Sequence, residues 1–376
     1  MQKAFDSVSM PILLKQLEGL GVRGGVLDWF KNYLTNRKQF VKINKFQSDL
    51  EKCSFGVPQG SSLGPSLFSV YVNSLCQTRI ANAELLMYAD DTAIIFRGKT
   101  WQQTLRVVES GLSLITKWLE THLLTLNATK TNYICFHKTK ASQPKVDLHI
   151  KIHTHPCNIN VTATGSRACD CTILERVNTV KYLGIIVDEH LNWQPHITLV
   201  STRTRKMIYI FKNLRLISDK ELLVSTYKAL CECLISYCIC AWGGAAKTMF
   251  IEIERAQRRA LKVLFRLKYH HPTTLLYSET KLLSVRKLYI LRSLIRYHKH
   301  DVPGHPTNNK RVRLCPVPFC KTTFAQRQYN HTAPKLYNII LKLKETRHMT
   351  NFELKKLILQ WLFLLDYEAI ETLLIS

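Results

Sequence analysis

Acidic residues are scarce in this chain of 376 residues, which has 27 Asp and Glu against 53 Lys and Arg and a formal net charge of +26. The imbalance is greatest after residue 135, where 38 basic residues face 17 acidic ones. Because 46% of the residues are hydrophobic, we expect the chain to fold rather than to remain disordered. So large a positive excess on a folded chain indicates a polyanionic partner, although a merely soluble basic protein is the plainer alternative.

Long hydrophobic runs are also missing. No run approaches the ~18 apolar residues of a membrane span, and the nearest one, residues 234–246, is interpreted as a buried helix. Gln2, Lys3 and Asp6 interrupt the apolar stretch that a secretory signal would need at the start. The 12 cysteines have no framework spacing, so we expect reduced thiols in an intracellular protein, nuclear or cytoplasmic, that has no membrane partner.

The apolar pattern divides the chain into a mixed first part and a helical second part. Helices are predicted over 9–20, 26–36, 66–75 and 101–124, and strands near 39–43, 52–57, 84–97, 132–136 and 179–188. From about 196 to 300 the pattern is almost entirely helical. Residues 138–178 are polar and resemble a variable insertion, the proline-rich stretch 301–318 indicates a linker, and a helical tail follows over 351–375.

Two adjacent carboxylates, Asp90 and Asp91, lie between apolar strands in the sequence Leu-Leu-Met-Tyr-Ala-Asp-Asp-Thr-Ala-Ile-Ile-Phe. Carboxylates in such surroundings are costly unless they are paired or bind a cation. At the tip of a hairpin they could hold Mg²⁺, which prefers oxygen ligands. Since successive strand residues point to opposite faces, one Asp is expected to be the main ligand and the other secondary. An ordinary turn is the plainer alternative.

A loop rich in glycine and proline, Gly-Val-Pro-Gln-Gly-Ser-Ser-Leu-Gly-Pro, covers residues 56–65. Its glycines allow backbone to approach a ligand closely, and Pro65 suits the first turn of the helix that follows. Gln59 offers an amide that can both donate and accept a hydrogen bond. Alone, the loop is weak evidence for a ligand site. Its position before Asp90, with a helix and a strand between them, strengthens both the loop and the aspartate pair as indications of such a site.

These motifs resemble those of LINE-type (non-LTR retrotransposon) reverse transcriptases. The loop and helix over 56–68 resemble one conserved element of that family, Tyr88-Ala-Asp-Asp91 resembles its catalytic turn, and residues 3–8 (Lys-Ala-Phe-Asp-Ser-Val) resemble the end of its first catalytic motif. Further resemblances to jockey- and CR1-like elements follow in order at 126–131, 180–184, Trp193, His196, 227–243, 255–259, 329–338 and 352–355. The resemblance therefore covers essentially the whole chain.

The resemblance implies an α+β fold shaped like a right hand. The palm would be an antiparallel sheet with helices over residues 1–190, interrupted by the insertion 138–178, and the fingers would be largely missing. An all-helical thumb would follow over 191–300, and a linker and C-terminal helical tail over 301–376. The implied activity is an RNA-directed DNA polymerase that takes an RNA template, a DNA primer and deoxynucleoside triphosphates and uses two Mg²⁺ ions. We infer no specific protein partner from the sequence.

The resemblance also implies roles for individual residues. Asp90 would be the main metal ligand and catalytic carboxylate, and Asp91 its companion. The nucleotide would contact Gln59, Gly60 and Lys130, with Phe5 as the aromatic gate that excludes a 2′-hydroxyl group. Leu183 and Gly184 would form the primer grip.

One departure from the family pattern concerns the first motif. There the metal-binding Asp stands five positions before the Phe, so counting back from Phe5 leads to a position before residue 1. Asp6 corresponds to the second Asp of the motif and is expected to act through hydrogen bonds rather than as a metal ligand. We therefore expect the chain to be an N-terminally truncated polymerase, inactive by itself. The alternative is a non-catalytic relic that only binds nucleic acid.

Two further clusters are candidates for binding. Arg255, Arg259, Lys262 and Arg266 follow one helical stripe, and from 255 to 313 only two acids accompany 15 basic residues. A solvated helix face is the plain alternative, but the lack of acids favours a surface for the template–primer duplex.

The histidines and cysteines at 153, 155, 157, 169 and 171 could bind zinc, although their spacing matches no known closed site.

Overall fold

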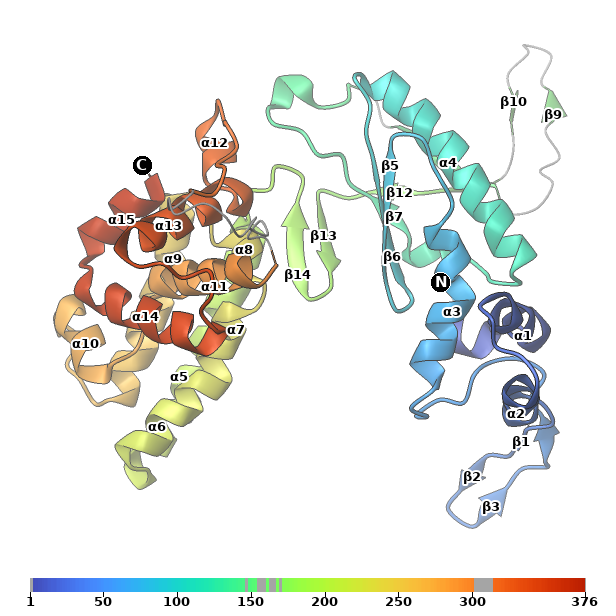
Figure 1. The fold of residues 1–376 in the computed structure, drawn as a ribbon, viewed down its shortest axis with the longest axis horizontal. Coiled ribbons are helices and arrows are strands. Elements are labelled where there is room, and N and C mark those ends of the chain that lie inside the picture. Colours follow the sequence, from blue (N-terminus) through green and yellow to red (C-terminus); the bar gives the residue numbers. More distant parts are fainter. Residues whose placement is uncertain are drawn as a thin grey trace. The chain divides into compact units, whose positions relative to one another are not determined.

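A computed structural model of the chain describes residues 3–145, 148–153, 160–161, 167–168, 171–300 and 314–375. The chain forms two compact units, residues 1–177 and 178–376, which are considered separately (Figure 1). Both helices and strands are present, as predicted, and each sheet found among these residues has two strands. Within the described ranges no helix has the length and apolar character needed to cross a membrane.

The first unit contains most of the strands. Its helical segments are η1 (Ala4–Ser7), α1 (Met10–Gly19), α2 (Gly25–Leu34), α3 (Gly64–Cys76), α4 (Trp101–Thr121), η2 (Ala128–Lys130) and η3 (Lys140–Ser142). Its strands are β1 (Lys38–Gln39), β2 (Lys42–Ile43), β3 (Phe46–Gln47), β4 (Glu51–Lys52), β5 (Ala83–Tyr88), β6 (Asp91–Phe96), β7 (Asn132–Tyr133), β8 (Lys151–Ile152), β9 (Asn160–Val161), β10 (Arg167–Ala168), β11 (Thr172–Ile173) and β12 (Glu175–Arg176).

The core of the first unit is built on α3, which is apolar on several sides. Its residues Phe68 and Tyr71 are almost fully buried and pack with Leu13 of α1 and Leu119 of α4. The Tyr71 hydroxyl accepts a hydrogen bond from the backbone N–H of Ser9 at 3.2 Å and donates one to a carbonyl at the end of α4. Helix α3 therefore fastens the segment before α1 to the segment after α4.

A second, smaller cluster lies at the other end of α4. Val108 packs there with Ile150, Ile152 and Leu174, which come from the predicted insertion. The described parts of that insertion pair as β8 with β11 and β9 with β10, both antiparallel, while β12 pairs in parallel with β7. The start and end of the insertion are thus held to the rest of the first unit.

The second unit opens with a hairpin, and the elements that follow it in residues 194–300 and 314–375 are helices. Its strands are β13 (Thr179–Tyr182) and β14 (Ile185–Asp188). Its helices are α5 (Gln194–Ile217), α6 (Lys220–Tyr227), the π-helical turn η4 (Lys228–Glu232), α7 (Cys233–Ser236), α8 (Ile239–Trp242), α9 (Lys247–Leu264), α10 (Thr273–Thr280), α11 (Val285–His300), α12 (Thr323–Gln326), α13 (Tyr329–Leu343), α14 (Asn351–Leu364) and α15 (Tyr367–Ile375).

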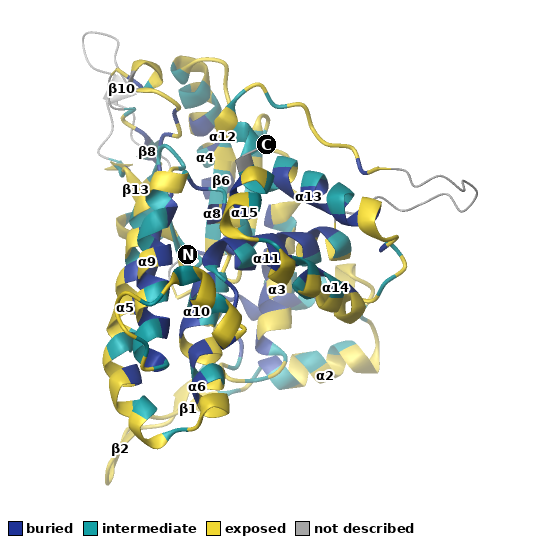
Figure 2. Cartoon of the chain, turned by 90° about the vertical axis from the view of Figure 1, so that its left-hand side faces the viewer, coloured by how far each residue is buried: buried dark blue, intermediate teal, exposed yellow. Residues whose placement is uncertain are grey.

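The two longest helices of this unit, α5 and α9, pack along one another. Small buried residues, among them Ser201 and Thr204 on α5 and Ala256 and Ala260 on α9, allow the helices to approach closely. Helix α11 lies in the same core and is buried on most of its length, as the dark blue of Figure 2 shows. Gly243 is needed beside it, because a Cβ there would collide with the ring of Tyr289.

The prediction of a single buried helix over 234–246 is wrong. The chain forms α7 and α8 instead, separated at Tyr237 and Cys238, and Cys238 has a positive φ of 49°. The indole N–H of Trp242 donates a hydrogen bond to the carbonyl of Tyr237 at 3.0 Å. A fully buried side chain thus stabilises the break, which apolar composition alone does not reveal.

His196, near the start of α5, gives the second unit a dependence on pH. The backbone N–H of Ile186 donates to its Nδ1 at 3.3 Å, and the ring lies against Trp242. Burial, together with the charge of Arg203, lowers the pKa of His196 from 6.5 to about 4. As the pH falls below 6.5 the unfolded chain takes up a proton that the folded chain refuses until about pH 4, so stability is lost across that window.

We therefore expect the second unit to unfold at lower urea concentration at about pH 5 than near neutral pH, and His196→Asn to reduce this loss. Asparagine is a suitable replacement because its Oδ1 can still accept the hydrogen bond from Ile186 but does not titrate. Urea midpoints of both proteins at the two pH values provide the measurement. Equal losses in the two proteins would contradict the assignment.

Candidate active site

Three motifs singled out in the sequence surround one hydrophobic core in the first unit. The cluster that contains Phe68 also holds Ala4, the first residue of η1, Val8 just after η1, Val57 of the loop before α3, and Met87 of β5. The ring of Phe5 stacks on that of Phe68 with centroids 4.5 Å apart. Residues far apart in the sequence are therefore brought into one neighbourhood.

Backbone hydrogen bonds join the first two of these motifs directly. The N–H of Gly56 donates to the carbonyl of Val8 at 2.8 Å, and the N–H of Val57 donates to the carbonyl of Phe5 at 3.0 Å. Gly56 has φ of 86°, and a Cβ on it would lie 3.0 Å from the Cα of Asp6. Glycine is thus required here both for its conformation and for the close approach.

The side chain of Gln59 completes this connection. Its Nε2 donates a hydrogen bond to Oδ1 of Asp6 at 2.6 Å, and both residues are exposed. Asp6 acts as a hydrogen-bond acceptor, in line with the role predicted for it. The next residue, Gly60, has φ of 75°, and a Cβ on it would have no other atom within 4 Å, so the backbone conformation rather than lack of space favours glycine here.

The same loop starts helix α3. The Oγ of Ser61 donates to the carbonyl of Pro58 at 2.8 Å and accepts from the N–H of Gly64 at 3.0 Å. A Cβ on Gly64 would lie 2.9 Å from that same carbonyl, so glycine is needed at the helix start as well. The loop conformation that presents Gln59 is therefore fixed from both sides.

Asp90 and Asp91 lie at the tip of the hairpin formed by β5 and β6, as predicted. Tyr88 pairs with Asp91, and Ala89, with a positive φ of 51°, makes the turn with Asp90. Both aspartates are exposed. Two adjacent carboxylates at an exposed tip, carried by strands whose apolar residues pack in the core, supply the oxygen ligands that a divalent cation such as Mg²⁺ prefers. The residues present therefore fit a metal site.

Lys130 is the last residue of the short turn η2 in the first unit. Asn127 caps this turn, because its Oδ1 accepts hydrogen bonds from the N–H of Lys130 and the hydroxyl of Thr129. Leu126, just before it, packs in the cores at both ends of α4. The predicted motif at 126–131 thus anchors a turn that exposes the Lys130 side chain.

Leu183 and Gly184 form the turn between β13 and β14 in the second unit. Their φ angles are 44° and 85°, and two positive values are what a tight type I′ hairpin turn requires. Tyr237 holds this turn, since its hydroxyl donates to the carbonyl of Leu183 at 2.6 Å and its ring lies 3.3 Å from where a Cβ of Gly184 would be. No pattern in the sequence indicates this contact.

Of the four residues in the predicted basic stripe, two are exposed on α9 and two form hydrogen bonds with the backbone. Arg255 and Arg259 are exposed on α9. Lys262 instead donates to the carbonyl of Tyr269 at 2.7 Å, and Arg266 lies beyond the helix, where it donates to the carbonyl of Arg215. Two of the four side chains thus also hold the end of α9 in place.

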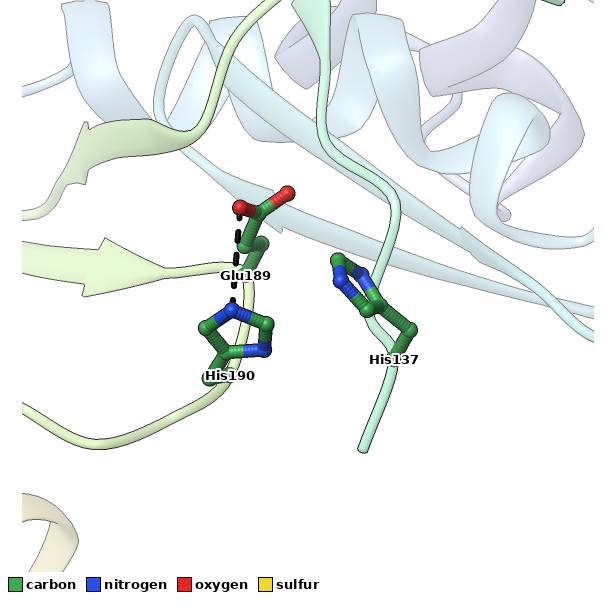
Figure 3. A group of neighbouring side chains, drawn as sticks. All are labelled: His137, Glu189 and His190. Atoms are coloured by element: carbon green, nitrogen blue, oxygen red, sulfur yellow. Dashed lines mark ion pairs between the residues drawn. The ribbon is translucent and has the colours of Figure 1, made fainter. Parts of the chain in front are cut away.

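The histidine and cysteine candidates for zinc are mostly outside the described residues, which include neither His155, Cys157 nor Cys169. Of the rest, Nδ1 of His153 lies 3.3 Å from Sγ of Cys171. Figure 3 draws a separate pair, Glu189 and His190, whose side chains are 3.8 Å apart. His137, the third residue labelled in the figure, belongs to the first unit, so we assign no metal site to these three residues.

Comparison with known proteins identifies relatives of this chain. Residues 1–187 match the family model described as reverse transcriptase (RNA-dependent DNA polymerase). The chain is 29% identical over 311 residues, 79% of its length, to the probable RNA-directed DNA polymerase from transposon BS of Drosophila melanogaster. It is 27% identical over 274 residues, 70% of its length, to the RNA-directed DNA polymerase from mobile element jockey of the same species.

A more distant relative is the Retrovirus-related Pol polyprotein from type-1 retrotransposable element R1 of Bradysia coprophila, 23% identical over 69% of this chain. The matches cover 32%, 27% and 24% of these three relatives, so the chain spans about a third of their length or less.

A chain with this site and these relatives is a member of the reverse transcriptase family of RNA-directed DNA polymerases. Within the family it belongs with the polymerases of non-LTR retrotransposons, as the sequence motifs predicted.

Proposed function

We propose that the chain is the palm and thumb part of a non-LTR retrotransposon polymerase that copies an RNA template into DNA from a DNA primer. The observation that carries this proposal is the hydrogen bond between Gln59 and Asp6. It joins the glycine- and proline-rich loop, residues 56–65, to the first motif, residues 3–8. The hairpin that carries Asp90 packs in the same core as both of them. One folded unit therefore holds together the three sequence motifs of the proposed polymerase site.

Asp90 and Asp91 are the residues proposed to hold Mg²⁺, with Asp90 as the main ligand. When bound, the ions would neutralise the charge of the triphosphate during in-line phosphoryl transfer. The residues of the chain would position the reactants. Gln59 is oriented by Asp6 and would contact the incoming nucleotide, with Gly60 lining its path, while the exposed ammonium of Lys130 would face its phosphates.

Phe5 is proposed to exclude a 2′-hydroxyl group from the nucleotide site. Its ring is partly buried and is stacked on Phe68, so its position is fixed by the core rather than by the ligand. A rigid aromatic wall can reject a substrate that carries one additional hydroxyl group. Deoxynucleoside triphosphates would therefore be preferred to ribonucleotides.

In the second unit, the turn at Leu183 and Gly184 is proposed as the primer grip. Its attachment to Tyr237 gives it the rigidity that holding a primer end requires. Arg255 and Arg259, with Lys262 and Arg266 near them, would contact the phosphates of the template–primer duplex. The whole unit is rich in basic residues, which supports a nucleic-acid partner.

Residues 1–376 do not include the Asp that the family places five positions before Phe5. We propose that these residues tested by themselves extend a primer poorly, because carboxylates from both sides of the site are needed to position the ions. The alternative, a relic that binds nucleic acid without turnover, predicts no activity even when the preceding motif is supplied.

The test is primer extension on an RNA template with Mg²⁺, using the chain extended upstream through the first motif. We expect this protein to extend the primer with deoxynucleotides, and Phe5→Val to increase the use of ribonucleotides relative to deoxynucleotides. The ratio of the two incorporation rates in each protein is the measurement. An inactive extended protein would favour the relic, and an unchanged ratio would show that Phe5 is only a core residue.

A further inference from the structure

Residues 38–52 of the first unit form a ribbon that is exposed along its whole length. Strands β1 and β4 pair at its base, with Lys38 opposite Lys52, and β2 and β3 pair near its tip, with Ile43 opposite Phe46. Every residue from 38 to 52 is exposed, which Figure 2 shows as yellow around β2.

This exposure is unusual because the ribbon is rich in large apolar side chains. Phe46 is 83% exposed, and Ile43, directly opposite, is 66% exposed. Phe40, Val41 and Leu50 are exposed as well. An isolated two-stranded ribbon is at best marginally stable in water, and a cluster of exposed apolar side chains usually marks a binding surface. The ribbon is therefore expected to be covered by a ligand.

The charge of the ribbon indicates the chemistry of that ligand. Lys38, Lys42, Lys45 and Lys52 all lie on it, and within the described part of the chain none of them forms an ion pair. Only two acids, Asp49 and Glu51, accompany them. Lysines that alternate with aromatic rings are what a single nucleic-acid strand requires, since phosphates attract the lysines and bases stack on the rings.

The base of the ribbon is attached directly to the candidate active site. Arg37 donates hydrogen bonds to the carbonyls of Leu34, Phe55 and Gly56, and its own carbonyl accepts from Cys53 at 2.9 Å. Gly56 is in turn the residue that packs on Asp6. A strand bound to the ribbon would thus be held by a part of the chain that leads without interruption into the Gln59 loop.

We propose that residues 38–52 bind single-stranded nucleic acid, with Phe40 and Phe46 against bases and Lys38, Lys42 and Lys45 against phosphates. This inference rests on the proposed polymerase function and gives that function a further contact for an unpaired strand. A single strand is favoured over a duplex because only unpaired bases offer their faces to an aromatic side chain.

Cross-linking tests the location of this contact in the 376-residue chain. A short RNA or DNA strand containing 5-bromouracil is bound and irradiated, and the attached peptides are identified by mass spectrometry. We expect attachment within the tryptic peptide 46–52, and its loss in Phe46→Ala. Attachment only to peptides after residue 178 would overturn the ribbon proposal and leave the polymerase proposal intact, whereas a chain that binds no strand would count against both.

Affinity measurements test the chemistry. We expect Phe40→Ala with Phe46→Ala to weaken binding of a single strand by about thirtyfold or more, and to weaken duplex binding less. Gln at Lys38, Lys42 and Lys45 should reduce the slope of log affinity against log salt by about 2. The matched controls are exposed residues elsewhere in the same unit, namely Leu20→Ala with Leu114→Ala, and Gln at Lys15, Lys99 and Lys117.

Equal losses in the ribbon variants and the controls would show that the ribbon has no specific role. A change from an oligomer to a monomer in Phe46→Ala, with strand binding unchanged, would instead identify the ribbon as a contact between protein chains and overturn the proposal. Size-exclusion chromatography of each variant makes this distinction.

Discussion

Replacing Asp90 by Asn is expected to lower the rate of primer extension more than about a hundredfold in the chain extended upstream through the first motif. Asparagine has nearly the same size but lacks the charge that attracts a divalent cation. Because Asp90 lies in an exposed turn outside the hydrophobic core, the substitution should leave the stability of the fold almost unchanged. Rates with Mg²⁺ and the thermal unfolding midpoint of each protein provide the measurement.

Three other aspartates sharpen this test. Asp28→Asn, on the exposed side of α2, is the matched control and should have no effect. Asp91→Asn should reduce the rate less than Asp90→Asn, because Asp90 is proposed as the main metal ligand and Asp91, the first residue of β6, as the secondary one. Asp6→Asn should mainly disturb Gln59. A loss in Asp6→Asn as great as in Asp90→Asn would show that the metal-binding Asp of the first motif has been assigned wrongly.

Arg286 lies at the centre of a buried cluster of charges in the second unit. Its Nε is 2.9 Å from a carboxylate oxygen of Glu371 on α15 and 3.4 Å from one of Glu254 on α9. The guanidinium group also lies over the ring of Phe250, 4.3 Å from its centroid. Burial raises the pKa of Glu254 even though Arg286 and Arg258 lower it, so the carboxylate depends on these neighbours for its charge.

We expect Arg286→Ala to reduce the free energy of unfolding by about 3–5 kcal/mol, because two buried carboxylates lose their shared counterion. Urea denaturation near neutral pH is the measurement. Arg259→Ala, which removes an exposed arginine of α9, is the matched control and should change stability by no more than about 0.5 kcal/mol.

A compensating variant separates charge from packing. If the loss comes from uncompensated charge, adding Glu254→Gln and Glu371→Gln to Arg286→Met should recover much of the stability that Arg286→Met loses. The loss should also be smaller at low pH, where Glu254, whose pKa is raised by burial, takes up a proton. No recovery in either case would mean that Arg286 acts mainly through its packing on Phe250.

The parts of the candidate site that could be predicted from the sequence are those fixed by local chemistry. Apolar residues on both sides of Asp90 predicted the hairpin β5–β6, and Gly64 followed by Pro65 predicted the start of α3. The hydrogen bond between Asp6 and Gln59 could be anticipated only as a type of interaction, because its partners are 53 residues apart. Pairings over such distances depend on the packing of the whole unit.

Other features escaped prediction because tertiary contacts override local preference. The break at Tyr237 depends on Trp242, and an apolar stretch gives no sign of it. Strands were expected near 39–43 and 52–57, but the structure forms four strands of two residues each. Without a buried face, the apolar residues of that segment had no core to define a longer strand.

The attachment of the β13–β14 turn to Tyr237 has a consequence for the order of folding. The tyrosine is 54 residues beyond Leu183, so the hairpin emerges from a ribosome well before the residue that holds its turn. The turn requires a leucine with positive φ, a conformation that costs free energy until the hydroxyl of Tyr237 and its ring are in place. During synthesis the hairpin would therefore remain loosely formed until α7 has appeared, and it would become rigid together with the helices rather than with the strands that precede it.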